Sequence, residues 1–207
     1  MRVALKAGMA MITRRSVRAS ADECSRTLPG DDLLPADGGT RLGSLTQAIT
    51  IHCLPHDVWP WIAQMGAGSR AGWYSYDILD NRHHRSATEI VPELQHLEAG
   101  MLFPALPGAT DGFTLAAFDP ERFLVLEVKG LDGQRQVTWA FVLEPAGSDS
   151  TRLIVRARGS AGPFGRLIIP IVHFIMQRKQ LLGIAERAET ARDLRASHAR
   201  RCDAHAS

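Results

Sequence analysis

The chain has 207 residues, a length that suits one domain with tails or at most two small domains. Its 45% hydrophobic and 22% charged residues are typical of a globular protein and exclude a fully disordered, collagen-like or coiled-coil chain. The net charge of +2 combines +5 over residues 1–20 with −3 over the remainder. A body so close to neutral argues against a nucleic-acid partner.

The cysteines are three, at positions 24, 53 and 202, and form no CxxC pair. This spacing argues against a disulfide framework or a zinc site and favours free thiols in a reducing cytoplasm. No segment reaches the roughly 18 apolar residues of a membrane helix, so we expect no integral membrane segment. The apolar stretch Ala7–Ile12 is too short for an export signal. We therefore expect residues 1–25 to be a flexible basic leader.

The regular elements begin after a loop over residues 26–44 that is rich in glycine, proline and aspartate. The alternating run Thr46–His52 predicts a strand. Two short helices follow, over His56–Met65 with a bend at Pro60, and over Trp73–Arg82. Five predicted strands follow, separated by short turns with no helix between them, which indicates an antiparallel meander. These strands are Met101–Ala105, Gly112–Phe118, Arg122–Val128, Arg135–Leu143 and Thr151–Arg158.

The last predicted element is a long helix from Phe164 to about Arg195, followed by a frayed tail over residues 197–207. Its first half is apolar on almost every side, so several neighbours should cover it. Strands segregated from helices indicate an α+β fold. The simplest arrangement is one domain, residues 26–196, in which a curved antiparallel sheet wraps around the long helix. A cavity then lies between the helix and the concave face.

The most distinctive sequence is Trp59–Gly66 followed by Arg70–Asp77, together with later pieces such as Thr138–Phe141. Over about residues 28–190 the chain resembles a bacterial, polyketide cyclase/dehydrase-like branch of the START-like, or SRPBCC, superfamily. That superfamily also contains the birch-pollen allergens and lipid-transfer domains. The resemblance implies a helix-grip fold and an internal cavity for small molecules. It carries over no catalytic motif.

Aromatic residues cluster at the two short helices, where they either line one end of such a cavity or pack as core. On the second helix Tyr74, Asp77, Ile78 and Asn81 would share a face. On the strand after Arg135, alternation turns Val137, Trp139, Phe141 and Leu143 toward the cavity. We expect the ligand-binding residues to be Trp61, Met65, Tyr74, Tyr76, Trp139, Phe141, Ile171, His173 and Ile175.

Catalytic residues are not defined by any motif. By residue type, Tyr76, Asp77 and His173 are the alternative acid/base candidates, although adjacent helical residues do not face each other. The structural reading makes Asp77 a hydrogen-bonding residue, with Arg70 as a candidate ion-pair partner. In the same structural reading, His173 is a core histidine whose ring has a hydrogen-bond partner.

The sequence also contains residues that suggest a metal, nucleotide or anion site. The neighbours His83 and His84 lack the spacing of metal ligands, and Gly66–Gly72 has the wrong spacing for a dinucleotide loop. We therefore expect no metal and no cofactor. Arg152, Arg156 and Arg158 share the outer face of their strand, either as a solvated surface or as an anion site.

These observations favour a protein that binds a hydrophobic or amphipathic small molecule, such as a lipid, isoprenoid or aromatic polyketide. The alternative is a cyclase or dehydratase acting on a carbonyl compound in the same cavity. A further alternative is a protein-interaction module that uses the leader or the C-terminal helix.

Overall fold

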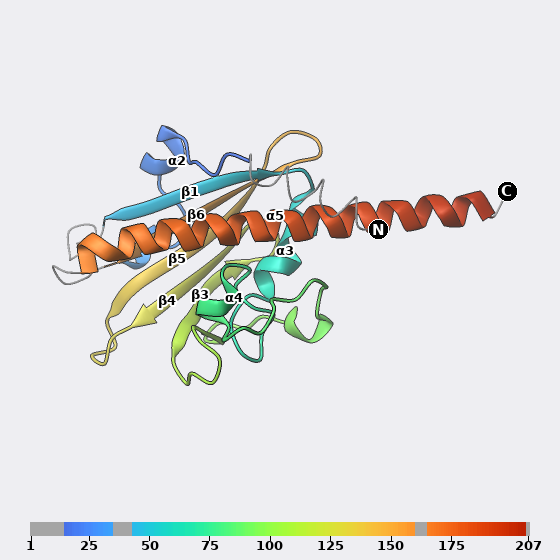
Figure 1. Cartoon of the computed structure of the whole chain (residues 1–207). Coiled ribbons are helices and arrows are strands. Elements are labelled where there is room, and N and C mark those ends of the chain that lie inside the picture. The colour runs from blue at the N-terminus through green and yellow to red at the C-terminus, as the bar shows by residue number, and fades with distance from the viewer. Residues whose placement is uncertain (1–14, 35–42, 160–164, 206–207) are drawn as a thin grey trace.

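The computed structural model describes residues 15–34, 43–159 and 165–205 (Figure 1). In chain order the helical elements and strands are α2 (Ala21–Ser25), η1 (Asp31–Leu33), β1 (Ser44–Ile51), α3 (Pro55–Ala63), α4 (Asp77–Asp80), η2 (Pro92–Leu94), β2 (Leu102–Pro104), β3 (Gly112–Asp119), β4 (Phe123–Lys129), β5 (Arg135–Pro145), β6 (Thr151–Gly159) and α5 (Gly165–His205). Strands β2 to β6 follow one another along the described chain, and the helical elements lie before them and after them.

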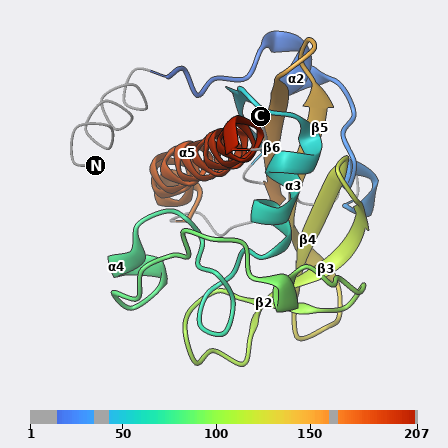
Figure 2. The same cartoon turned by 90° about the vertical axis from the view of Figure 1, so that its right-hand side faces the viewer.

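The strands form one antiparallel sheet in the order β1-β6-β5-β4-β3-β2. The first strand pairs with the last, so that Ser44 lies opposite Arg158 and Ile51 opposite Thr151. Register shifts interrupt the β3–β4 and β4–β5 ladders, and such irregularities bend and twist a sheet. Helix α5 crosses one face of the sheet (Figures 1 and 2). The α+β prediction is confirmed, and the architecture is the helix-grip fold.

The main core lies between the sheet and helices α3 and α5. From α5, Leu181, Ile184, Ala185 and Ala188 are fully buried, at the i, i+3, i+4, i+7 spacing of one helix face. They pack in one cluster with sheet residues such as Phe141. This contact fixes the rotation of α5 about its own axis.

The N-terminal segment covers the opposite face of the sheet (Figure 2). Leu28 packs there against Ala48, Val125 and Ile154 in a second apolar cluster. Helix α2 begins with a capping box, in which Ser20 and Glu23 bond to each other's backbone N–H. The expectation of a flexible leader is therefore wrong for residues 15–25, because they pack on the sheet. Residues 1–14 lie outside the described residues.

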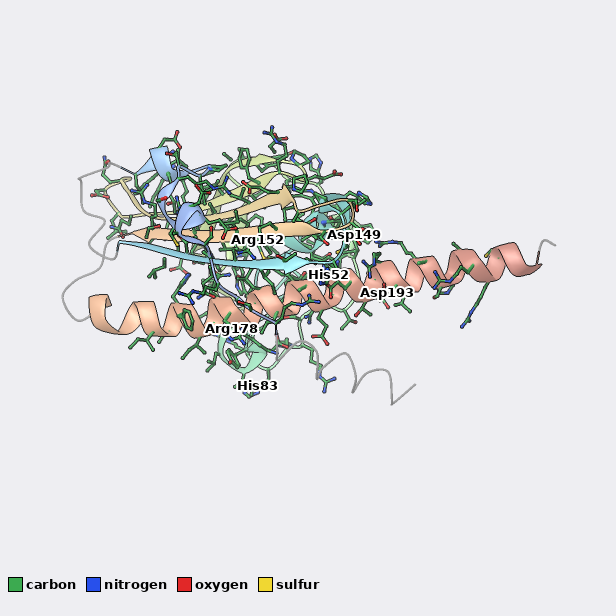
Figure 3. All side chains as sticks on the ribbon, turned by 90° about the horizontal axis from the view of Figure 1, so that it is seen from above. His52, His83, Asp149, Arg152, Arg178 and Asp193 are labelled. Atoms are coloured by element: carbon green, nitrogen blue, oxygen red, sulfur yellow. The ribbon has the colours of Figure 1, made fainter. Side chains whose placement is uncertain are left out.

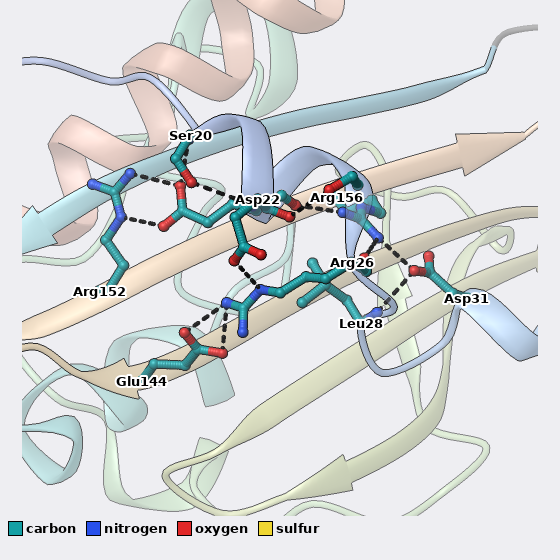
Figure 4. Close-up of polar contacts among 10 residues, drawn as sticks. Ser20, Asp22, Arg26, Leu28, Asp31, Glu144, Arg152 and Arg156 are labelled. Atoms are coloured by element: carbon teal, nitrogen blue, oxygen red, sulfur yellow. Dashed lines mark hydrogen bonds and ion pairs between the residues drawn. The ribbon is translucent and has the colours of Figure 1, made fainter.

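The arginines of β6 join this segment to the sheet (Figure 4). Arg152 pairs with Glu23 at 2.7 Å, and Arg156 pairs with Asp31 and donates to the Glu23 carbonyl. Arg156 is only 4% exposed. The interpretation of these arginines as a solvated surface is therefore wrong. Acidic and carbonyl groups of residues 23–31 cover Arg156 and Arg152 and accept their hydrogen bonds.

Residue His52, at the end of β1, lies beside α5 (Figure 3). Its backbone N–H donates to the Glu189 carboxylate at 2.7 Å, and its carbonyl accepts from Arg192. Arg15 donates to both oxygens of the same Glu189. Glu189 thus connects α5 to β1 and to the N-terminal segment.

Two helix predictions need correction. The second short helix covers only Asp77–Asp80, because Tyr74 has a φ of 59° and its N–H donates to the Ser86 hydroxyl. Tyr74 is buried while Ile78 is 67% exposed, so they do not share a face. Helix α5 continues to His205 and extends beyond the sheet (Figure 1). Among the described residues no helix is long and apolar enough to cross a membrane.

Candidate functional site

A cavity of about 500 Å³ lies between α5, the β2, β3 and β5 side of the sheet, and the segment that leads into α4. Its accessible lining is mostly apolar. The lining residues are Trp73, Ser75, Asp80, Ala105, Phe113, Val137, Trp139, Val172, His173, Met176, Gln177 and Gln180.

Three aromatic rings form one wall of this cavity. Trp73 stacks on Trp139 with centroids 5.3 Å apart and an interplanar angle of 27°. Phe113 contacts both rings, at 5.6 Å from Trp73 and 5.0 Å from Trp139. The Trp73 indole donates to the Ala105 carbonyl at 3.3 Å. The wall is therefore held in place by its own packing and suits a flat, apolar ligand.

A polar stripe on α5 faces this wall. It consists of His173, Gln177 and Gln180, which lie at i, i+4 and i+7 and so share one helix face. The His173 ring lies 6.1 Å from the Trp139 ring. Burial lowers the pKa of His173 to about 4, so the imidazole is neutral at physiological pH and can both donate and accept.

The two glutamines form a hydrogen-bond chain with Trp139. The Trp139 indole N–H donates to Gln177 Oε1 at 2.9 Å. Gln177 Nε2 donates to Gln180 Oε1 at 2.9 Å, and Gln180 Nε2 contacts the Met65 sulfur at 3.6 Å. Both glutamines are 2% exposed. Buried amides in such a chain have fixed orientations.

Asp80 places a buried carboxyl group at the edge of the same cavity. The residue is 6% exposed, and neither carboxylate oxygen has a hydrogen-bond partner within the described part of the chain. Burial, together with the charge of Asp77, raises the pKa of Asp80 to about 6. The lining residues that the structure describes include no lysine or arginine to offset this charge.

The predicted ligand-binding residues are only partly brought together. Trp139 and His173 line the cavity. Trp61, Met65, Tyr74 and Phe141 are no more than 2% exposed and belong to the main core. The other three point to the surface, with exposed fractions of 41% for Tyr76, 60% for Ile171 and 49% for Ile175.

The alternative catalytic residues do not form an acid/base group. The Asp77 carboxylate accepts from the Ser86 hydroxyl at 2.5 Å and from the Ser86 N–H at 3.1 Å, so it ties α4 to the following loop. Tyr76 is exposed. Arg70 does not pair with Asp77; it donates to the carbonyls of Ala63 and Met65.

The sequence did not predict several lining residues, namely Asp80, Phe113, Gln177 and Gln180. Trp73 belongs to the aromatic cluster that was predicted either to line the cavity or to pack as core. A signal for the glutamines was present, since both follow His173 at helical spacing. Within the described ranges, no group of three or more His, Cys, Asp and Glu side chains is placed to hold a metal ion.

No family model matches the chain, and no curated protein matches it. Solved structures do resemble it. A protein from Nitrosomonas europaea is 14% identical with a TM-score of 0.48, over 76% of this chain and 99% of its own. A polyketide cyclase-like protein from Corynebacterium glutamicum is 14% identical with a TM-score of 0.43, over 72% and 92%. Norcoclaurine synthase from Thalictrum flavum is 16% identical with a TM-score of 0.39, over 78% and 97%.

Proposed function

We propose that the protein binds an apolar small molecule with at least one aromatic ring in the cavity between α5 and the sheet. The observation that carries this proposal is a cavity of about 500 Å³ walled by Trp73, Phe113 and Trp139. Known small-molecule sites have volumes of about 300–1,000 Å³ and mostly apolar linings with a few polar groups. Burial of ligand surface would contribute about 25 cal/mol per Å² before ordering costs.

The edge of the cavity supports entry of such a ligand from the side of α4 and α5. Val172 lines the cavity and is 47% exposed. Ile78 and Leu79 on α4, next to the lining residue Asp80, are 67% and 64% exposed. An exposed apolar patch beside a cavity is a feature of ligand-binding grooves. This patch favours a hydrophobic ligand over a fully polar one.

The first test is organic extraction of the purified, denatured protein followed by mass spectrometry. A stoichiometric hydrophobic compound would support the proposal and give its chemical class. The second test titrates the protein with diphenylmethane and follows the change in tryptophan emission, since two tryptophans line the cavity.

The variant Ala105→Phe adds a ring inside the cavity, where Ala105 lines the wall. It should weaken diphenylmethane binding at least tenfold. The matched control Leu131→Phe changes a fully exposed side chain in the β4–β5 turn and should bind as the unmodified protein does. Equal binding by both variants, or no binding by the unmodified protein, would reject this cavity as the site.

A further inference from the structure

We infer that the cavity selects uncharged aromatic ligands that carry a carbonyl-type oxygen, and that the side-chain amides of Gln177 and Gln180 hold this oxygen. The inference rests on the proposed binding function and adds the ligand's polar group to it. It is carried by the hydrogen-bond chain from Trp139 through both glutamines, which lines the cavity on the α5 side.

The direction of this chain is set by chemistry. An indole N–H can only donate, so the group of Gln177 that faces Trp139 at 2.9 Å is its oxygen. The Gln177 amide nitrogen then faces Gln180, at 2.9 Å from the Gln180 oxygen. The Gln180 nitrogen is therefore the end of the chain. The indole of Trp139, which can only donate, thus fixes the orientation of both glutamine amides.

The chain ends at a donor that lacks a strong acceptor. Each amide nitrogen carries two N–H groups, and the described contact of Gln180 Nε2 is the Met65 thioether at 3.6 Å, a weak acceptor. Both amide oxygens already accept one strong hydrogen bond, whereas the N–H groups of Gln180 meet no strong acceptor among the described residues. The glutamines therefore present N–H groups toward a ligand, and an acceptor oxygen is the group that matches them.

The other lining residues argue against a negatively charged ligand. Asp80 is a buried carboxyl group, and the described lining offers no basic side chain against it. His173 is neutral at physiological pH. A carboxylate or phosphate ligand would enter an apolar cavity without a cation to meet it. A ketone, quinone or ester oxygen satisfies the amides without bringing charge.

The test uses three diphenyl compounds of nearly equal size. Benzophenone carries a carbonyl where diphenylmethane carries a methylene, and benzhydrylamine carries an amine on the same carbon. Dissociation constants of all three are measured by calorimetry. We expect benzophenone to bind at least tenfold more tightly than diphenylmethane.

The variant Gln180→Met removes the amide donors and keeps an unbranched side chain of similar length. It should bring the benzophenone preference to about one while leaving diphenylmethane affinity within threefold. The matched control Gln134→Met changes an exposed glutamine in the β4–β5 turn and should keep the full preference. If Gln180→Met loses its near-ultraviolet circular dichroism, Gln177→Met is measured in its place.

Irradiation of bound benzophenone gives a readout that needs no variant. The excited carbonyl oxygen takes a hydrogen atom from a nearby C–H group, and the two carbon radicals then join in a new C–C bond. The adduct, found by peptide mass spectrometry, should lie on Met176, which lines the cavity one residue before Gln177.

The outcomes separate the two proposals. Equal binding of benzophenone and diphenylmethane would overturn this inference and leave the binding function standing. Adducts confined to residues outside the cavity would overturn both. Tighter binding of benzhydrylamine would also overturn this inference and would assign the polar contact to Asp80. If none of the three compounds binds, both the proposed function and this inference fail.

Discussion

The guanidinium of Arg152 holds both carboxylate oxygens of Glu23, with Nε 2.7 Å from one and the terminal nitrogen 2.9 Å from the other. This two-point contact joins β6 to α2 across 129 residues of sequence. It is the kind of pairing that adds geometric specificity as well as energy. Glu23 also bonds to the Ser20 N–H, so one carboxylate caps α2 and fixes it to the sheet.

Replacement Glu23→Gln should destabilise the protein by about 2 kcal/mol at pH 7, because glutamine keeps the cap and loses the ion pair. The hydrogen bonds from Arg152 lower the pKa of Glu23 from its ordinary 4.5 to about 2. A lowered carboxyl pKa contributes stability above pH 4.5 that is lost as the pH falls toward 2. Urea unfolding at pH 7, 4 and 2.5 measures this.

The control for that series is Glu93→Gln, which removes an exposed carboxylate and should change the unfolding free energy by less than about 0.5 kcal/mol. The unmodified protein and Glu23→Gln should differ less in unfolding free energy at pH 2.5 than at pH 7. If the difference is the same at all three pH values, the ion pair is not its cause.

Asp80→Asn should have the opposite effect and stabilise the protein by about 2 kcal/mol at pH 7.5. The pKa of Asp80 is raised from 3.8 to about 6, so folding favours its protonated form. The folded state therefore loses stability as the pH rises from about 4 to 6, and the loss is constant above that. Asp77 on the same helix and His173 across the cavity are the neighbouring titratable groups.

Thermal unfolding of both proteins between pH 4 and 7.5 tests this, with the exposed Asp111→Asn as control. Asp80→Asn should flatten the decline in melting temperature between pH 4 and 6. A less stable Asp80→Asn protein at pH 7.5 would show that the carboxylate is satisfied in the folded state.

Phe141→Ala should destabilise the protein by about 3–5 kcal/mol, because Phe141 is fully buried in the main core. Ile175→Ala removes a side chain that is half exposed and should cost less than about 0.5 kcal/mol. Urea unfolding compares the two. Similar losses would contradict the rotation of α5 described above, which turns Ile175 outward.

Trp139→Phe should destabilise the protein by about 1–3 kcal/mol, since it leaves the buried Gln177 oxygen without its donor. Gln177→Met removes the other partner. Because the two residues share one hydrogen bond, the double variant should be more stable than the sum of the single effects by about 1 kcal/mol. Additive effects in urea unfolding would mean that the hydrogen bond contributes nothing to stability.

The sequence predicted the strands and the overall arrangement well, because alternation is a local signal. Val137 and Trp139 alternate with polar neighbours and do line the cavity. The rotation of α5 about its own axis was harder to predict, because the first half of the helix is apolar on almost every side. The stripe Leu181, Ile184, Ala185 and Ala188 decides that rotation. When this stripe is extended toward the N-terminus of α5 at helical spacing, it passes through Gln177 and His173. Ile175 lies on another side of the helix.

The remaining errors involve partners that are distant in sequence. Local periodicity favoured a helix at Tyr74, but a hydrogen bond to Ser86 holds that residue in a left-handed conformation. The segment over residues 15–25 has no strong propensity of its own. It is ordered by Arg152 and by Glu189, which no local pattern connects to it.

The long separations within this sheet also have a kinetic consequence. Strand β1 has no partner until β6 has been synthesised, and Arg15 has no contact with Glu189 until 174 more residues have followed. Contacts of such separation slow folding, because the chain loses loop entropy before it gains their energy. On the ribosome, the face of the sheet that packs against α5 cannot be completed until α5 has emerged. We therefore expect the newly made chain to rely on chaperones until α5 has been released.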